Sequence, residues 1–116
     1  MSESVAQEIM AERERQKSEE GWSPEHDDRH KNGELALAAA SYAIGGRWTK
    51  DRNGVSHVEL HHMPIIWPWN RAWWKSTNRR RNLVKAGALI VAEIERIDRL
   101  EHHLATAIEA LEPDHG

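Results

Sequence analysis

Apolar positions recur at helical spacing near the start of the chain. Val5, Ala6 and Ile9 form a thin apolar stripe, and Glu, Arg, Gln and Lys occupy most other positions up to residue 19. These are good helix-forming residues, and Gly21 follows them as a stop signal. The pattern predicts a helix over residues 3–19.

A second helical pattern follows directly. Ser23 is a suitable N-cap, Pro24 fits the first turn, and several acids after it suit the positive end of a helix dipole. Residues 35–43 are rich in alanine, and Gly45 and Gly46 end the pattern. We therefore expect a helix over residues 24–44.

Residues 45–76 lack a sustained period and form a tryptophan-rich connection. Pro64 and Pro68 exclude a regular element around the tryptophans of this segment. Apolar and polar residues alternate over 55–62, which allows a short hairpin there. A connection of this length in a small domain is often functional.

The last pattern is the longest and predicts a helix over residues 77–112, capped by one of residues 76–78 and followed by Pro113. Its apolar seam is close to a heptad repeat and consists of Leu83, Gly87, Ile90, Ile94, Ile97, Leu104, Ile108 and Leu111. At 1.5 Å per residue this helix is roughly 50 Å long, more than so short a chain can cover by itself. The expected fold is all-α, a single domain over residues 1–116 with three main helices, which assembles into a helical-bundle homo-oligomer, a dimer or higher.

Composition narrows the class of protein. The chain has 116 residues and no cysteine, which excludes a disulfide framework, a thiolate zinc site and a cysteine nucleophile. No apolar run approaches the roughly 20 residues that span a bilayer, and the N-terminus lacks the apolar stretch of a secretory signal. We expect a cytoplasmic protein that does not bind membranes.

Carboxylates on two predicted helices could form a metal site. Asp27, His30 and Glu34 share one face of the second helix, while Glu95 and Asp98 lie beside the apolar seam of the third. Carboxylates at the edge of a bundle core are costly unless they are paired or bind a metal, and facing helices build sites for hard cations. The predicted Mg²⁺ ligands are Glu34, Glu95, Asp98, Asp27 and Glu93. The alternative is an ordinary amphipathic surface, paired with neighbouring arginines.

A basic cluster opens the long helix. Arg79, Arg80 and Arg81 oppose the helix dipole there, whereas a helix N-terminus with arginines is a good phosphate site. The predicted phosphate-binding residues are Arg79, Arg80, Arg81, Lys85 and Lys75. The alternative is a solvated basic turn, or pairing with the acidic first helix.

Aromatic usage is unusual, with six Trp, one Tyr and no Phe. Trp faces stack on nucleobases, and Trp69, Trp73 and Trp74 are the predicted base-stacking residues. The same rings could instead fill a core or a dimer interface. The histidine pairs 61–62 and 102–103 are adjacent, so on regular elements their side chains point in different directions.

Two stretches resemble small phage and prophage proteins. One is the segment Glu20-Gly21-Trp22-Ser23-Pro24-Glu25-His26-Asp27-Asp28 with Gly33-Glu34-Leu35-Ala36; the other runs from Trp67-Pro68-Trp69 through Trp73-Trp74-Lys75 to Glu93-Ile94-Glu95-Arg96. The general plan is similar to that of the MazG-like all-α nucleotide pyrophosphohydrolases.

The resemblance implies cleavage of NTPs or dNTPs to the monophosphate and pyrophosphate, with magnesium held by an ExxE pair and an ExxD pair. Glu95 and Asp98 match ExxD, and Glu34 would be the last acid of the first pair. Lys31 stands where that pair needs its other acid, so Asp27 and His30 would have to substitute for it.

Two classes of function follow. The leading hypothesis is a phage-type, Mg²⁺-dependent nucleotide pyrophosphohydrolase whose partner is a nucleotide or another phosphate-bearing small molecule. The rival is a protein without chemistry, either one that binds or sequesters nucleotides against a host defence, or an interaction module that uses its tryptophans. Nucleic acid or a host defence protein is a further candidate partner.

Overall fold

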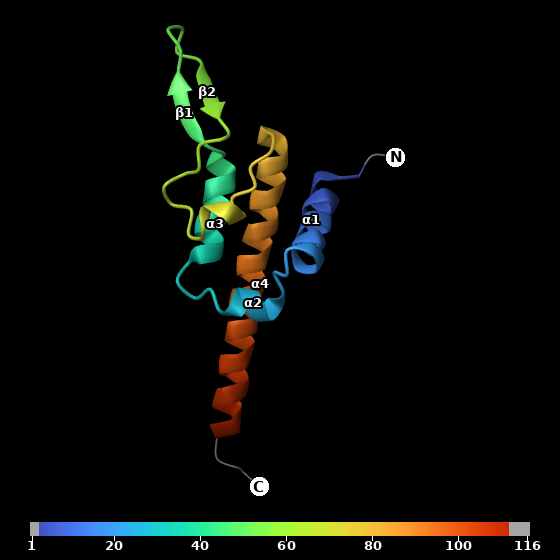
Figure 1. Cartoon of the computed structure of the whole chain (residues 1–116). Coiled ribbons are helices and arrows are strands. Elements are labelled where there is room, and N and C mark those ends of the chain that lie inside the picture. The colour runs from blue at the N-terminus through green and yellow to red at the C-terminus, as the bar shows by residue number, and fades with distance from the viewer. Residues whose placement is uncertain (1–2, 112–116) are drawn as a thin grey trace.

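The computed structural model describes residues 3–111 of the chain and is mostly helical. Its elements are α1 (Val5–Glu19), α2 (Pro24–Asp28), α3 (Glu34–Ile44), β1 (Arg47–Lys50), β2 (Ser56–Glu59), the 3₁₀ turn η1 (Arg71–Trp73) and α4 (Arg79–Leu111). Helices α1, α2 and α3 pack along one part of α4, and the hairpin projects beyond α3 (Figure 1). The expected helical fold with a long C-terminal helix is confirmed, with a two-stranded sheet added.

Helix α1 begins at a capping box, in which the Ser4 hydroxyl accepts from the backbone N–H of Gln7 and the Gln7 side chain accepts from the backbone N–H of Ser4. Its buried side chains are polar: Glu12, Arg13 and Gln16. From the apolar stripe of the sequence pattern, Ile9 packs over Gly87 of α4, so polar and apolar side chains share the contact between these two helices.

The predicted helix over 24–44 is wrong as a single element, because the chain leaves helical geometry between α2 and α3. Gly33 precedes α3 with a φ of +82°, in the left-handed region that glycine adopts more readily than other residues. Ser23 caps α2 by accepting from the backbone N–H of His26, as the sequence indicates. The break turns α2 across α4 before α3 packs along it (Figure 1).

Strands β1 and β2 pair in antiparallel register, with Arg47 opposite Glu59 and Lys50 opposite Ser56. Asp51 organises the turn, since its Oδ1 accepts from the backbone N–H groups of Asn53 and Val55. The hairpin that the alternation allows does form, and its first strand lies outside the predicted range of 55–62.

The apolar core lies between α3, α4 and the tryptophan-rich connection. Leu35, Ala38 and Leu89 are fully buried, and Trp22 and Trp67 join them. The Tyr42 hydroxyl accepts from the backbone N–H of Lys75 and so ties the connection to α3. Much of the tryptophan content therefore serves the core.

Helix α4 has 33 residues and is capped by Asn78, whose side chain accepts from the backbone N–H of Arg81. Its buried face includes Ala88, Leu89 and Ala92. Most of the predicted seam is exposed, at Leu83, Ile90, Ile94, Ile97, Leu104, Ile108 and Leu111. Residues 100–111 are exposed throughout and extend past α2, which makes the molecule 75 Å long (Figure 1).

Candidate functional site: an aromatic pocket

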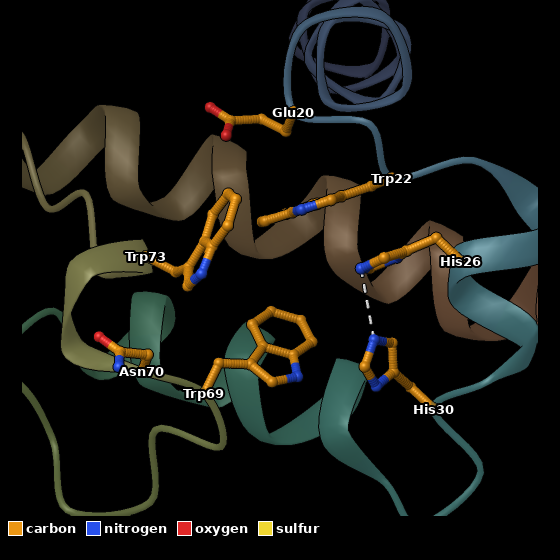
Figure 2. A pocket seen from close by; sticks show the side chains of 7 residues that line it. All are labelled: Glu20, Trp22, His26, His30, Trp69, Asn70 and Trp73. Carbon is orange, nitrogen blue, oxygen red and sulfur yellow. Dashed lines mark hydrogen bonds between the residues drawn. The ribbon is translucent and has the colours of Figure 1, made fainter.

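Three tryptophans and two histidines surround a cavity of about 360 Å³ (Figure 2). The aromatic residues come from two separate parts of the chain and meet beside α4. The full lining consists of Glu20, Trp22, His26, His30, Trp69, Asn70 and Trp73. The volume suits a ligand of about one or two rings, at the lower end of the range for small-molecule sites.

Local hydrogen bonds place the rings on the α1–α2 side. The backbone N–H of Trp22 donates to the carbonyl of Gln16, which fixes the chain as it leaves α1. The Ser23 cap then starts α2 and brings His26 one turn later to the pocket wall. His30 follows at the end of this turn, where its backbone N–H donates to the carbonyl of Asp27.

The opposite wall comes from the tryptophan-rich connection. Asn70 caps η1 by accepting from the backbone N–H of Ala72, and the turn presents Trp73 to the cavity. Trp69 lies just before this turn, and its ring packs beside that of His30 (Figure 2). Pro68 prevents a strand or helix here, so the turn is free to place both rings.

The rings contact one another edge to face and face to face. The Trp22 and His26 rings are parallel within 7°, with centroids 6.1 Å apart. Trp69 tilts against Trp22 at 5.6 Å and against His30 at 5.2 Å. These contacts hold the walls in place before any ligand binds.

A polar chain runs behind the two histidines. Arg13 and Asp27 are both buried and form an ion pair at 2.6 Å, and the Asp27 carboxylate faces His26 Nδ1 at 3.1 Å. His26 Nε2 in turn lies 3.3 Å from His30 Nε2. Burial lowers the pKa of His30, and the nearby His26 lowers it further, so the neutral ring is favoured at neutral pH.

The acid at the pocket rim is neutralised. The Glu20 carboxylate lies 2.7 Å from the Lys75 ammonium and 3.3 Å from the Arg15 guanidinium. Burial by itself raises the pKa of Glu20, but the hydrogen bonds and charges of Lys75 and Arg15 outweigh it and lower the pKa below its usual value. Glu20 is therefore an ionised but paired group.

The predicted base-stacking residues separate into two places. Trp69 and Trp73 line the cavity. Trp74 stacks on Tyr42 with centroids 4.7 Å apart and packs against the core. The pocket thus contains two of the three predicted base-stacking residues, together with Trp22, which was not among them.

The predicted Mg²⁺ ligands do not converge on one point. Asp27 and Glu95 approach the same group, but it is the Arg13 guanidinium, at 2.6 and 3.0 Å. Glu93 pairs with Arg96 in its own helix, Glu34 accepts from the backbone N–H of Asn32, and Asp98 is exposed. Within residues 3–111 these five acids form no cluster of three ligand atoms, so the arrangement does not fit a magnesium centre.

The predicted phosphate-binding residues are each engaged elsewhere. Arg80 pairs with Glu8 and Arg81 with Glu12, which is the pairing to the acidic first helix that the sequence left open. Arg79 donates to the carbonyl of Ala43, Lys85 donates to that of Lys75, and Lys75 pairs with Glu20. Burial lowers the pKa of Lys85, as expected for an ammonium enclosed by the fold.

Sequence reasoning missed Trp22 and Arg13 as parts of the site. Trp22 lies in the segment that carries the phage resemblance, and its place between Gly21 and a capped helix was the available signal. Arg13 gives no signal, because it lies among many charged residues in a helix that looks exposed. His26 and His30 are four residues apart, a spacing that places two side chains on one face of a helix but does not reveal the aromatic wall opposite them.

No protein-family model, curated protein or solved structure matches the chain. The pocket is therefore interpreted from its own geometry. Among the described residues, no helix is both long and apolar enough to cross a membrane.

Proposed function

We propose that the protein binds a nucleotide-type ligand by stacking the flat heteroaromatic base in the pocket, between Trp73 and the contacting rings of Trp22 and Trp69, without converting it. The observation that carries this proposal is the cavity enclosed by Trp22, Trp69 and Trp73 with two histidine rings. Stacking on aromatic side chains is worth about 1–3 kcal/mol per base. The two imidazoles and the Asn70 amide supply hydrogen-bonding groups for the base edge.

The charge state of the pocket favours a neutral ring over a cation. A cage for an organic cation combines aromatic faces with electrostatic attraction. Here the only carboxylate of the lining, Glu20, already pairs with Lys75 and Arg15. Aromatic faces without a free negative charge suit an uncharged base.

A phosphate group would lie toward Lys75. The Lys75 ammonium is 5.6 Å from the centroid of the Trp73 ring, and its side chain is half exposed. The exposed ammonium can therefore meet a phosphate at the rim while it keeps its contact with Glu20, so that the carboxylate stays paired. The other predicted phosphate-binding residues stay with their protein partners in this proposal.

A binding protein agrees with the geometry better than the pyrophosphohydrolase does. Hydrolysis of the MazG-like kind needs carboxylates that hold magnesium beside the phosphates. Three of the predicted ligands instead pair with arginines, Asp27 and Glu95 with Arg13 and Glu93 with Arg96. A homo-oligomer built on the exposed α4 stripe is part of the proposal and would leave the pocket of each chain intact.

Calorimetric titration with nucleosides and nucleotides, with and without Mg²⁺, tests the proposal. Trp73 is the variant of choice because 46% of its surface is exposed, so Trp73→Ala should spare the fold. We expect the base affinity to fall at least tenfold, from the lost stacking. Trp48→Ala is the matched control, since Trp48 is 44% exposed and lies on the hairpin, and it should bind like the wild type.

Three results would contradict the proposal. One is the absence of binding to every nucleoside and nucleotide tested at millimolar concentration. Another is equal affinity of Trp73→Ala and the wild type. The third is release of pyrophosphate in the presence of magnesium, which would restore the enzyme hypothesis, whereas ligand recovered intact supports binding alone.

A further inference from the structure

We propose a second site, independent of the pocket, in which Glu59, His61 and His62 bind a divalent transition metal ion such as Zn²⁺. One ligand atom from each of these residues lies within 4.8 Å of the other two. The cluster forms where the hairpin ends, and it was not among the predicted metal ligands. It is also the one group of three metal-ligating side chains found within residues 3–111.

A tight turn brings the three side chains together. Glu59 is the last residue of β2, and the backbone N–H of His62 donates back to the carbonyl of Glu59 at 3.2 Å. This closes a turn over residues 59–62. His62 Nε2 then lies 2.8 Å from Glu59 Oε2, and the two histidine rings are 4.3 Å apart.

The turn also allows two adjacent histidines to bind the same ion. On a helix, neighbouring side chains point about 100° apart, as the other pair His102 and His103 illustrates with centroids 6.2 Å apart on α4. His61 and His62 are not on a regular element, so both imidazoles can reach one ion. The sequence expectation that such pairs diverge does not apply here.

The donor set indicates the kind of metal. Two imidazoles and one carboxylate suit zinc and neighbouring transition metals, while magnesium and calcium prefer oxygen ligands. Three protein ligands leave a fourth tetrahedral position for water. His61 also lines a second cavity of about 460 Å³, together with Leu60, Trp74, Ser76 and Thr77, so that position has space for an exogenous ligand.

Arg47 is the competitor for this site. It pairs with Glu59 across the hairpin at 2.9 Å, through the same oxygen that faces His62. The Arg47 side chain is 60% exposed, so it can swing into water and release the carboxylate. Metal binding and this ion pair should therefore exclude each other.

The test is calorimetric titration of the whole, untagged chain with ZnCl₂ at neutral pH. We expect one Zn²⁺ per chain, and at least tenfold weaker binding in His61→Ala and in His62→Ala. His102→Ala/His103→Ala is the matched control and should bind like the wild type. Arg47→Ala should bind at least as tightly as the wild type, because the competing cation is gone. The folds are compared by circular dichroism, and the altered side chains are all at or near the surface.

Cobalt supplies an independent readout. Co²⁺ should give the intense visible absorption of a four-coordinate site in the wild type and lose it in His61→Ala. The proposal is overturned if the wild type binds zinc only at millimolar concentration or more weakly, if His61→Ala and His62→Ala retain wild-type affinity, or if the control variant loses binding.

Discussion

Arg13 connects more of the molecule than any sequence pattern suggested. Its guanidinium donates to Asp27, to the carbonyl of Trp22 and to Glu95, so it joins α1 to the turn after it, to α2 and to α4. Arg13 and Asp27 are both fully buried. Because Asp27 also contacts His26, this ion pair supports the pocket wall as well as the fold.

Replacing Arg13 by methionine should therefore be strongly destabilising. The change leaves the Asp27 carboxylate buried without its cation, and removal of one partner of a buried pair costs about 3–5 kcal/mol. We expect urea unfolding of Arg13→Met to show a loss of that size in the free energy of unfolding. Arg52→Met, at an exposed turn position, serves as control and should change it by less than about 0.5 kcal/mol.

A double variant separates the loss of charge balance from the loss of packing. In Arg13→Met/Asp27→Leu no buried charge of this pair remains, so a substantial part of the stability should return. If Arg13→Met alone costs less than about 1 kcal/mol, the pair is not the link between the elements that its burial suggests.

At the scale of single residues, the sequence did not reveal which polar and charged side chains are buried. The pattern of α1 identified a helix, yet the side chains that enter the interior are Glu12, Arg13 and Gln16. Helical periodicity ranks positions by hydrophobicity, so a polar interior face is invisible to it. The aromatic pattern indicated Trp69 and Trp73, which line the cavity, and equally Trp74, which packs against the core, because the sequence does not distinguish a ring in a pocket from a ring in a core.

At the scale of elements, glycine accounts for both the success and the error of the sequence analysis. Gly45 and Gly46 end α3 as expected. Gly33 lies inside the predicted helix over residues 24–44, whereas its left-handed backbone separates α2 from α3. Composition alone cannot tell a tolerated glycine from a break, because the difference lies in the packing of α2 across α4.

Gly46 offers a sharp test of how the hairpin is attached. A Cβ at this position would lie 2.2 Å from the carbonyl oxygen of Glu59, a backbone atom that cannot move aside, and the φ of Gly46 is +150°. Gly54 at the hairpin turn also has a positive φ, but a Cβ there would meet nothing within 4 Å. The two glycines thus differ in space and share an unfavourable conformation for other residues.

Gly54→Ala should cost about 1–2 kcal/mol from backbone conformation alone. Gly46→Ala should cost about 1–3 kcal/mol more, because the contact with Glu59 adds steric strain. Urea unfolding measures both, and hydrogen exchange of residues 47–59 shows whether the loss is confined to the hairpin. Equal costs for the two variants would mean that the approach of Gly46 to Glu59 is not tight in solution.

At the scale of the whole molecule, α4 is longer than the rest of the chain can cover. Ile94, Leu104 and Ile108 are more than half exposed, and residues 100–111 are exposed along their whole length. Apolar residues recur along the helix at alternating spacings of four and three, except at one position of the repeat, which Glu101 occupies. Such a stripe is typical of helices that pair with another helix.

We predict that this stripe closes a homodimer, and Leu104→Glu tests it without disturbing the folded body. Leu104 belongs to the exposed end of α4, so the change cannot weaken the packing of α1 or α3. Burying a leucine contributes about 1.5–3 kcal/mol per chain, and a buried glutamate adds a desolvation cost, so dimer affinity should fall at least a hundredfold. Light scattering after size exclusion should give a dimer for the wild type and a monomer of 13.4 kDa for Leu104→Glu, with unchanged helix content. Thr106→Glu is the control, because it adds the same charge on the opposite face of the helix and should remain dimeric. A wild type that is monomeric at every concentration would contradict the prediction and show that α4 ends as a single exposed helix.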